Sequence, residues 1–179
     1  LRQERLCETL GLRQRQLRIA EELISLLAPF GPSAKLAEAY LRQGDVCTLI
    51  RRFDAADRAL HTALRMTRER PGGADRGAER NVLRSIGLLR SHEGRHEDAI
   101  AVFEGALAID RELGDAPAAA GELASLGNIL RKIGRPEEGL RALEAAQQDL
   151  EAMTGRLQEL ADRAQRGQGE RGRSGTSTP

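Results

Sequence analysis

The sequence is poor in aromatic residues and in cysteine. Its 179 residues include no Trp, one Tyr and three Phe, so that aromatic side chains make up only 2%. A single globular core usually holds more large rings than this, whereas helices stacked in pairs are packed mainly by Leu and Ala. The two cysteines, Cys7 and Cys47, stand alone without C-x-x-C spacing. This isolation favours two reduced thiols over a disulfide or a redox pair.

The chain also lacks an excess of charge of either sign, and it lacks long apolar runs. Its 28 Lys and Arg nearly balance its 27 Asp and Glu, which gives a formal net charge of +1. This balance argues against direct binding of nucleic acid through its phosphates. No apolar run reaches the ~18 residues that a membrane-spanning helix needs, and no secretory signal is visible. We therefore expect a cytoplasmic protein that binds neither a membrane nor nucleic acid.

What the sequence does have is an internal repeat. Three pairs of small residues lie 40 residues apart: Gly87 and Gly127, Gly94 and Gly134, and Ala106 and Ala146. Residues of the same kind lie 43 positions before Gly87, Phe103 and Ala106, at Gly44, Leu60 and Ala63. The extra residues fit the loop composition of residues 70–75. A period of this length is typical of a helical unit stacked on copies of itself.

Each repeat reads as a pair of helices. In residues 117–152, Asp115 and Pro117 are typical of a helix start. Gly134 followed by Pro136 marks the end of one helix and the start of the next. Apolar residues recur at helical spacing on both sides of this turn, and no stretch alternates with the period of a strand. The pattern predicts an all-α fold of stacked antiparallel helix pairs.

The repeat divides the chain into six parts. A truncated first repeat spans residues 1–30, with Gly11 at the turn position, and three whole repeats follow at residues 34–70, 77–112 and 117–152. Apolar residues continue at spacings of three and four, which predicts either a separate C-terminal helix at residues 153–166 or an extension of the last helix, covering the apolar end of the array. Residues 167–179 have no apolar side chain and are expected to be disordered.

These repeats resemble those of the tetratricopeptide repeat family. The resemblance is carried by Leu123 to Leu130, by the turn Gly134 to Gly139, by Leu143 and Ala146, and again from Leu83 to Ala106. It departs from the family pattern at Arg51, which stands where the other turns have glycine. The resemblance implies a right-handed α-solenoid, a superhelix that binds proteins or peptides, catalyses nothing and needs no cofactor. The 40-residue period resembles the longer-looped branch of the family, which is found in bacterial regulators and in motor and polarity adaptors. The composition, heavy in Arg, Ala and Gly, favours a bacterial source, and we expect the chain to be the C-terminal part of a larger bacterial regulatory protein.

In this family the first helices of successive repeats line a concave groove, where a protein or peptide ligand is expected. That resemblance places in the groove Glu38, Leu41, Asp45, Thr48 and Leu49 of the first whole repeat, Asn81, Arg84, Leu88, Ser91 and His92 of the second, and Gly121, Ala124, Asn128, Arg131 and Lys132 of the third. Such a groove is acidic at one end and basic at the other, which suits an extended or helical peptide of graded charge. The family's clamp for chaperone tails is not expected, because Leu41 and Asp45 stand where it needs lysine and asparagine.

One string suggests a metal site instead. The run His92-Glu93-Gly94-Arg95-His96 matches H-E-x-x-H, which binds zinc when both imidazoles project from one continuous helix. The repeat register puts Gly94 at the turn between two helices, so that His92 ends one helix and His96 begins the next. We therefore expect no metal site and no enzyme, with a zinc hydrolase as the contrary alternative.

A further alternative is an oligomerisation module. The apolar residues that continue from Ala146 through Leu150, Met153, Leu157 and Leu160 to Ala164 have heptad spacing. Such spacing gives a helix a seam through which two copies associate. Self-association through this C-terminal segment is therefore the alternative to a peptide-binding groove.

Overall fold

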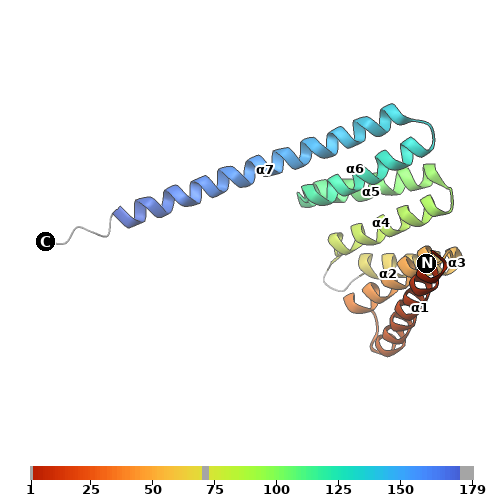
Figure 1. The fold of residues 1–179 in the computed structure, drawn as a ribbon. Helices are drawn as coiled ribbons and strands as arrows, with labels where there is room; N and C mark the ends of the chain where they lie inside the picture. The colour runs from red at the N-terminus through yellow and green to blue at the C-terminus, as the bar shows by residue number, and fades with distance from the viewer. Residues whose placement is uncertain (1, 70–72, 174–179) are drawn as a thin grey trace.

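The computed structural model describes residues 2–69 and 73–173 and, among their side chains, those of residues 9–69, 73–160 and 163. Figure 1 shows how the elements follow one another along the chain. They are α1 (Arg2–Leu27), the short 3-10 helix η1 (Ala28–Phe30), α2 (Ala34–Leu49), α3 (Phe53–Arg68), α4 (Arg76–His92), α5 (His96–Leu113), α6 (Ala116–Lys132) and α7 (Pro136–Arg173). No strand occurs within these two ranges of the backbone.

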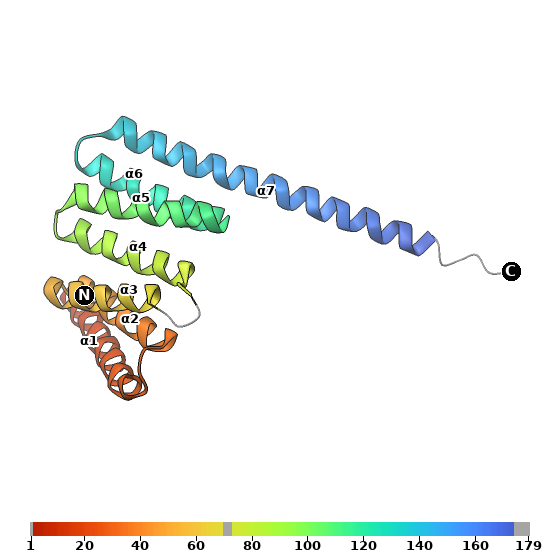
Figure 2. The same cartoon turned by 180° about the vertical axis from the view of Figure 1, so that it is seen from behind.

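The helices pack as successive antiparallel hairpins. Helix α2 packs on α3, α4 on α5 and α6 on α7, while contacts of α3 with α4 and of α5 with α6 join one hairpin to the next. Helix α1 packs on α2 at the N-terminal end. Figures 1 and 2 show the hairpins rising in order from α1 to α7. The architecture is the all-α solenoid that the repeat predicts.

The helix ends follow local sequence signals. Each first helix of a hairpin begins at a capping side chain that accepts a hydrogen bond from the backbone N–H three residues on, at 3.0 to 3.2 Å. These caps are Ser33, Asp75 and Asp115. The turn inside each hairpin needs one residue with positive φ, which is Gly94 at 82°, Gly134 at 80° and Arg51 at 60°. The turn positions of the three repeats therefore coincide with the predicted ones.

Glycine allows the two helices of each hairpin to approach closely. A Cβ atom added to Gly44 would lie 2.5 Å from Cγ of Leu60, and one added to Gly87 would lie 2.9 Å from Cε2 of Phe103. Because carbon atoms in a packed core stay about 3.5–4 Å apart, neither position has room for a side chain. The repeated glycines thus mark the helix–helix contact of each unit.

The first repeat differs from the prediction. Residues 2–27 form a single helix, α1, which passes through Gly11 without a turn. Good helix formers surround this glycine, and a glycine inside a helix costs only about 1 kcal/mol relative to alanine. The segment at 28–33 then provides the only break before α2. The N-terminal end is therefore one long helix lying on α2.

The C-terminal end also differs. Helix α7 runs without interruption from Pro136 to Arg173, so that the segment 153–166 is an extension of the last helix and not a separate one, and residues 167–173 of the predicted tail are helical as well. Figures 1 and 2 show its second half projecting away from the other helices. Leu157 and Leu160 are 57% and 60% exposed, so this part covers no end of the solenoid. Residues 174–179 lie outside the described residues.

Candidate functional site

The inner face of the solenoid is hollowed between α2 and α4. Both are first helices of their hairpins, and residues at helical spacing on each point toward the same space. The hollow has a volume of about 370 Å³. Its lining is Leu41, Asp45, Thr48 and Leu49 of α2 and Asn81, Arg84, Ser85, Leu88 and His92 of α4.

Two further hollows extend this one along the same face. One, of about 390 Å³, shares Leu41 and Asn81 with it and adds Glu38 and Met66. The other, of about 380 Å³, lies between α1 and α2 and shares Asp45 and Leu49. Because neighbouring hollows share residues, the three form one continuous depression across α1, α2 and α4, which we call the inner groove.

Exposed apolar side chains run along the inner groove. Leu49 is 51% exposed and Leu88 is 42% exposed. On α1, Ile19 and Leu23 are 50% and 41% exposed and line the same groove. Apolar side chains that stay in contact with water along a groove mark a surface suited to a partner.

The charged residues of the groove lie around this apolar track. Asp45 is half-buried where the hollows meet, and burial raises the pKa of its carboxyl. A hydrogen bond from the Ser85 hydroxyl and the charges of Arg84 and Arg42 oppose this rise. Arg42 itself is exposed and pairs with Glu38 at 2.7 Å. The groove thus has two carboxylates on α2, that of Glu38 being paired with Arg42, and the guanidinium of Arg84 on α4.

A cluster of buried charged side chains lies beneath Arg84. The Nε atom of Arg84 lies 3.7 Å from Oε1 of Glu122, a side chain that is only 1% exposed. Burial raises the pKa of Glu122 to about 7, against the lowering effect of Arg84. Deeper in, Arg80 donates to Asp110 at 2.9 Å. The cluster joins α4, α5 and α6 and places the guanidinium of Arg84 at the rim of the groove.

The predicted groove residues fall into two groups. The structure brings nine of the fifteen to the inner groove: Glu38, Leu41, Asp45, Thr48, Leu49, Asn81, Arg84, Leu88 and His92. The other six lie outside it, among them the exposed Gly121 and the half-buried Ala124 of α6. Ser91 is half-buried at the end of α4, while Asn128, Arg131 and Lys132 are exposed on α6, outside these three hollows.

Sequence reasoning missed the part of the groove that α1 supplies. The resemblance placed only residues of the three whole repeats in the groove, whereas Ile19 and Leu23 belong to residues 1–30. It also missed Glu122, although a signal was present. The equivalent positions of the other repeats hold Ala39 and Val82, so a carboxylate at this register is an anomaly.

The H-E-x-x-H string does not form a single helical face. His92 is the last residue of α4 and His96 the first of α5, with Gly94 in the left-handed turn between them. Within the described residues, no group of His, Cys, Asp and Glu side chains has an arrangement that could hold a metal ion. Cys47 is buried with a free thiol, and the side chain of Cys7 lies outside those described.

None of the helices, over the residues that the structure covers, combines the length and apolar character needed to cross a membrane.

Residues 35–112 match the profile of a family described as Tetratricopeptide repeat. This segment holds α2 to α5, the two hairpins whose first helices line most of the inner groove. No curated protein matches the sequence. Among solved structures the chain is similar to the crystal structure of BtubC (BKLC) from P. vanneervenii, with 21% sequence identity and a TM-score of 0.66. The similarity covers 80% of this chain but 59% of that one, so this chain spans less than two thirds of its length. At this identity the likeness concerns the fold.

Proposed function

Because residues 35–112 carry tetratricopeptide repeats, as the sequence predicts, we propose that this chain is a non-catalytic scaffold module that binds a peptide segment of another protein in its inner groove. Repeats of this kind stack into extended surfaces whose common use is protein recognition. The finer assignment, a peptide ligand held across α1, α2 and α4, rests on the shape and chemistry of the groove.

The apolar track is the observation that carries the proposal. Leu49 and Leu88 stand on neighbouring helices at the centre of the groove, each about half exposed. A peptide helix lays apolar side chains into such a groove at every third or fourth residue, and its backbone or polar side chains meet the groove's polar groups. Asn81 provides an amide that can donate to and accept from a peptide backbone. Asp45 favours a ligand that brings a donor or a positive charge to the centre.

The same features support a ligand of graded charge. The acidic residues Glu38 and Asp45 belong to α2, whereas the basic residues Arg84 and His92 belong to α4. Asn128, Arg131 and Lys132 on α6 would extend the basic side if the ligand runs on beyond the hollows. We propose that the module works in the cytoplasm of a bacterium as the C-terminal part of a larger regulatory protein, which the repeat period and the Arg- and Ala-rich composition support.

The test starts from a display library of randomised peptides selected on the purified chain. The affinities of selected peptides are then measured by calorimetry for Leu49→Ser with Leu88→Ser. We expect at least a tenfold loss, since two buried leucine contacts would be removed and each is worth about 1.5–3 kcal/mol when fully buried. The matched control is Leu113→Ser with Leu140→Ser, two leucines that are 49% and 58% exposed outside the groove. Equal affinities for the two double variants would contradict the groove assignment.

A further inference from the structure

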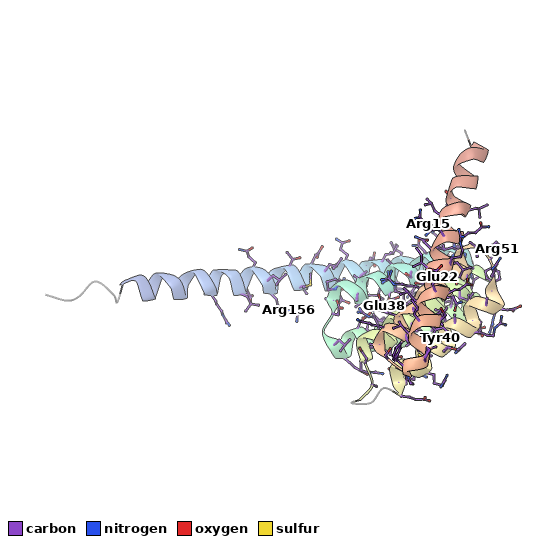
Figure 3. All side chains as sticks on the ribbon, turned by 90° about the horizontal axis from the view of Figure 1, so that it is seen from below. Arg15, Glu22, Glu38, Tyr40, Arg51 and Arg156 are labelled. Carbon is purple, nitrogen blue, oxygen red and sulfur yellow. The ribbon has the colours of Figure 1, made fainter. Side chains whose placement is uncertain are left out.

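The C-terminal part of α7 carries an apolar seam whose exposure to water increases along the helix. The seam consists of Leu150, Met153, Leu157 and Leu160, at alternating spacings of three and four residues. Leu150 is 38% exposed, and Leu157 and Leu160 are 57% and 60% exposed. In Figure 3, which labels Arg156 on this part of α7, no other element lies beside the helix.

The same seam begins inside the solenoid. Leu143 and Ala146 continue the spacing toward the N-terminal half of α7, where Ala146 is 7% exposed. A Cβ atom added to Gly127 of α6 would lie 2.9 Å from Cγ of Leu143. The first part of the seam therefore packs on α6 of the same chain, and the rest continues without a partner after α7 has passed α6.

The spacing identifies the kind of partner. A strict alternation of three and four corresponds to 3.5 residues per turn, which keeps the seam facing a single helix wound around it in a left-handed supercoil. The seam is also narrow, since Asp149, Thr154 and Arg156 border it. A stripe only two positions wide in seven fits one helix, whereas a face packed into a globular core is broader.

We propose that this seam pairs with α7 of a second copy of this chain, in parallel and in register. A second copy offers the same leucines and the same narrow width. Parallel pairing places Asp149 opposite Thr154 of the second copy and keeps the two Arg156 side chains on opposite sides. Antiparallel pairing centred near residue 159 would instead set Arg156 against Arg163 of the other chain, and like charges across a seam are unfavourable.

The pairing also supplies the stability that a lone projecting helix lacks. Gly155 lies in this part of α7 with nothing within 4 Å of an added Cβ, and a helix-interior glycine costs about 1 kcal/mol. Most of the stability of a helix in a protein comes from packing of its apolar face and not from intrinsic propensity. Pairing of two chains would put two inner grooves in one particle, so that a partner with two binding segments would gain avidity.

The first experiment is light scattering of the full chain over roughly a hundredfold range of concentration, since the mass of a dimer depends on concentration. The parent should reach twice the 19.5 kDa of one chain. Leu157→Asp places a charge in the seam and should give the mass of one chain. Ala152→Asp places the same charge on an exposed position off the seam and should leave the mass of two. The helical melting of the solenoid should be the same in both variants, which shows that each folds.

The second experiment tests orientation. In a parallel pair in register, residue 160 of one chain meets residue 160 of the other within reach of a disulfide. Leu160→Cys should therefore form a covalent dimer on mild oxidation, and Glu159→Cys, off the seam, should form none above the background of Cys7 and Cys47 in the parent. A monomer at every concentration, a dimer that survives Leu157→Asp, or a dimer that fails to cross-link through residue 160 would overturn the proposal. The affinity of each chain for a groove peptide should not change in Leu157→Asp, so this result is independent of the proposed function.

Discussion

Substituting alanine at two glycines of α6 tests the packing of the last hairpin. At Gly127 an added Cβ would meet the backbone oxygen of Gly139 at 2.9 Å and Cγ of Leu143 at 2.9 Å. At Gly121, six residues earlier on the same helix, an added Cβ meets nothing within 4 Å. The two substitutions are chemically identical and differ only in what surrounds the new methyl group.

The magnitude follows from two opposing terms. Replacing a helix-interior glycine by alanine stabilises the helix by about 1 kcal/mol in both variants. Only Gly127→Ala then incurs overpacking, which typically costs about 1–3 kcal/mol, and here the obstacle includes backbone, which moves less readily than a side chain. The helix term cancels in the comparison, so Gly121→Ala should exceed Gly127→Ala in free energy of unfolding by about 1–3 kcal/mol.

The assay is urea denaturation followed by circular dichroism, with hydrogen exchange of residues 116–150 as a local readout, because solenoids can unfold unit by unit. In a domain of this size the expected gap in Tm is roughly 2–4 °C for each kcal/mol. Wild type should lie between the two variants or close to the lower one. Equal stabilities for Gly121→Ala and Gly127→Ala would refute the close contact between α6 and α7.

Three other predictions concern stability. Glu122→Gln should match wild type below pH 4.5, become increasingly more stable than wild type between pH 4.5 and 7, and keep that advantage above pH 7. The folded pKa of Glu122, about 7, lies above its ordinary value of 4.5, so wild type loses stability across this interval while the glutamine variant does not; parallel curves from urea titrations at several pH values would contradict this. Arg51→Gly should raise the free energy of unfolding by a few tenths to ~1 kcal/mol, because glycine adopts the φ of 60° at this position without strain. The gain is reduced by loss of the Arg51 guanidinium, which lies 5.1 Å from the centroid of the Phe53 ring; a lower Tm in thermal denaturation would count against this prediction. Ala106→Leu should lower the free energy of unfolding by about 1–3 kcal/mol, since Ala106 is fully buried. Arg111→Leu, at an exposed position on the same helix, should have little effect. Equal urea midpoints for the two variants would argue against the repeat register.

The repeat itself could be predicted because its signals are local and occur three times. Ser33, Asp75 and Asp115 cap the first helices through their own side chains, and the turn residues stand at the same place in each unit. Arg51 holds a conformation that glycine adopts more easily, yet its unit still turns there. Here the register of neighbouring residues outweighs the preference of one residue. The hollows between α2 and α4 lie on the first helices of the repeats, where the family resemblance, carried over by the same register, puts a groove.

The two ends could not be predicted from the repeat. At Gly11 the pattern indicated a turn, but the residues around it are good helix formers and the helix continues. In α7 the change from a packed to a projecting helix depends on where α6 begins, which leaves no mark in the sequence of α7. The burial of Glu122 depends on the packing of α4 and α5 around it. In the sequence, the only indication of an unusual residue is that Ala39 and Val82 occupy the equivalent positions of the other repeats.

The most direct test of the central claim is a crystal structure of the chain with a peptide selected on it. We expect the peptide to lie across α1, α2 and α4, with apolar side chains against Leu49 and Leu88 and a polar or positively charged group near Asp45. A peptide seated on the opposite face, between α5 and α7, or along the projecting half of α7 would contradict the claim that the inner groove is the binding site.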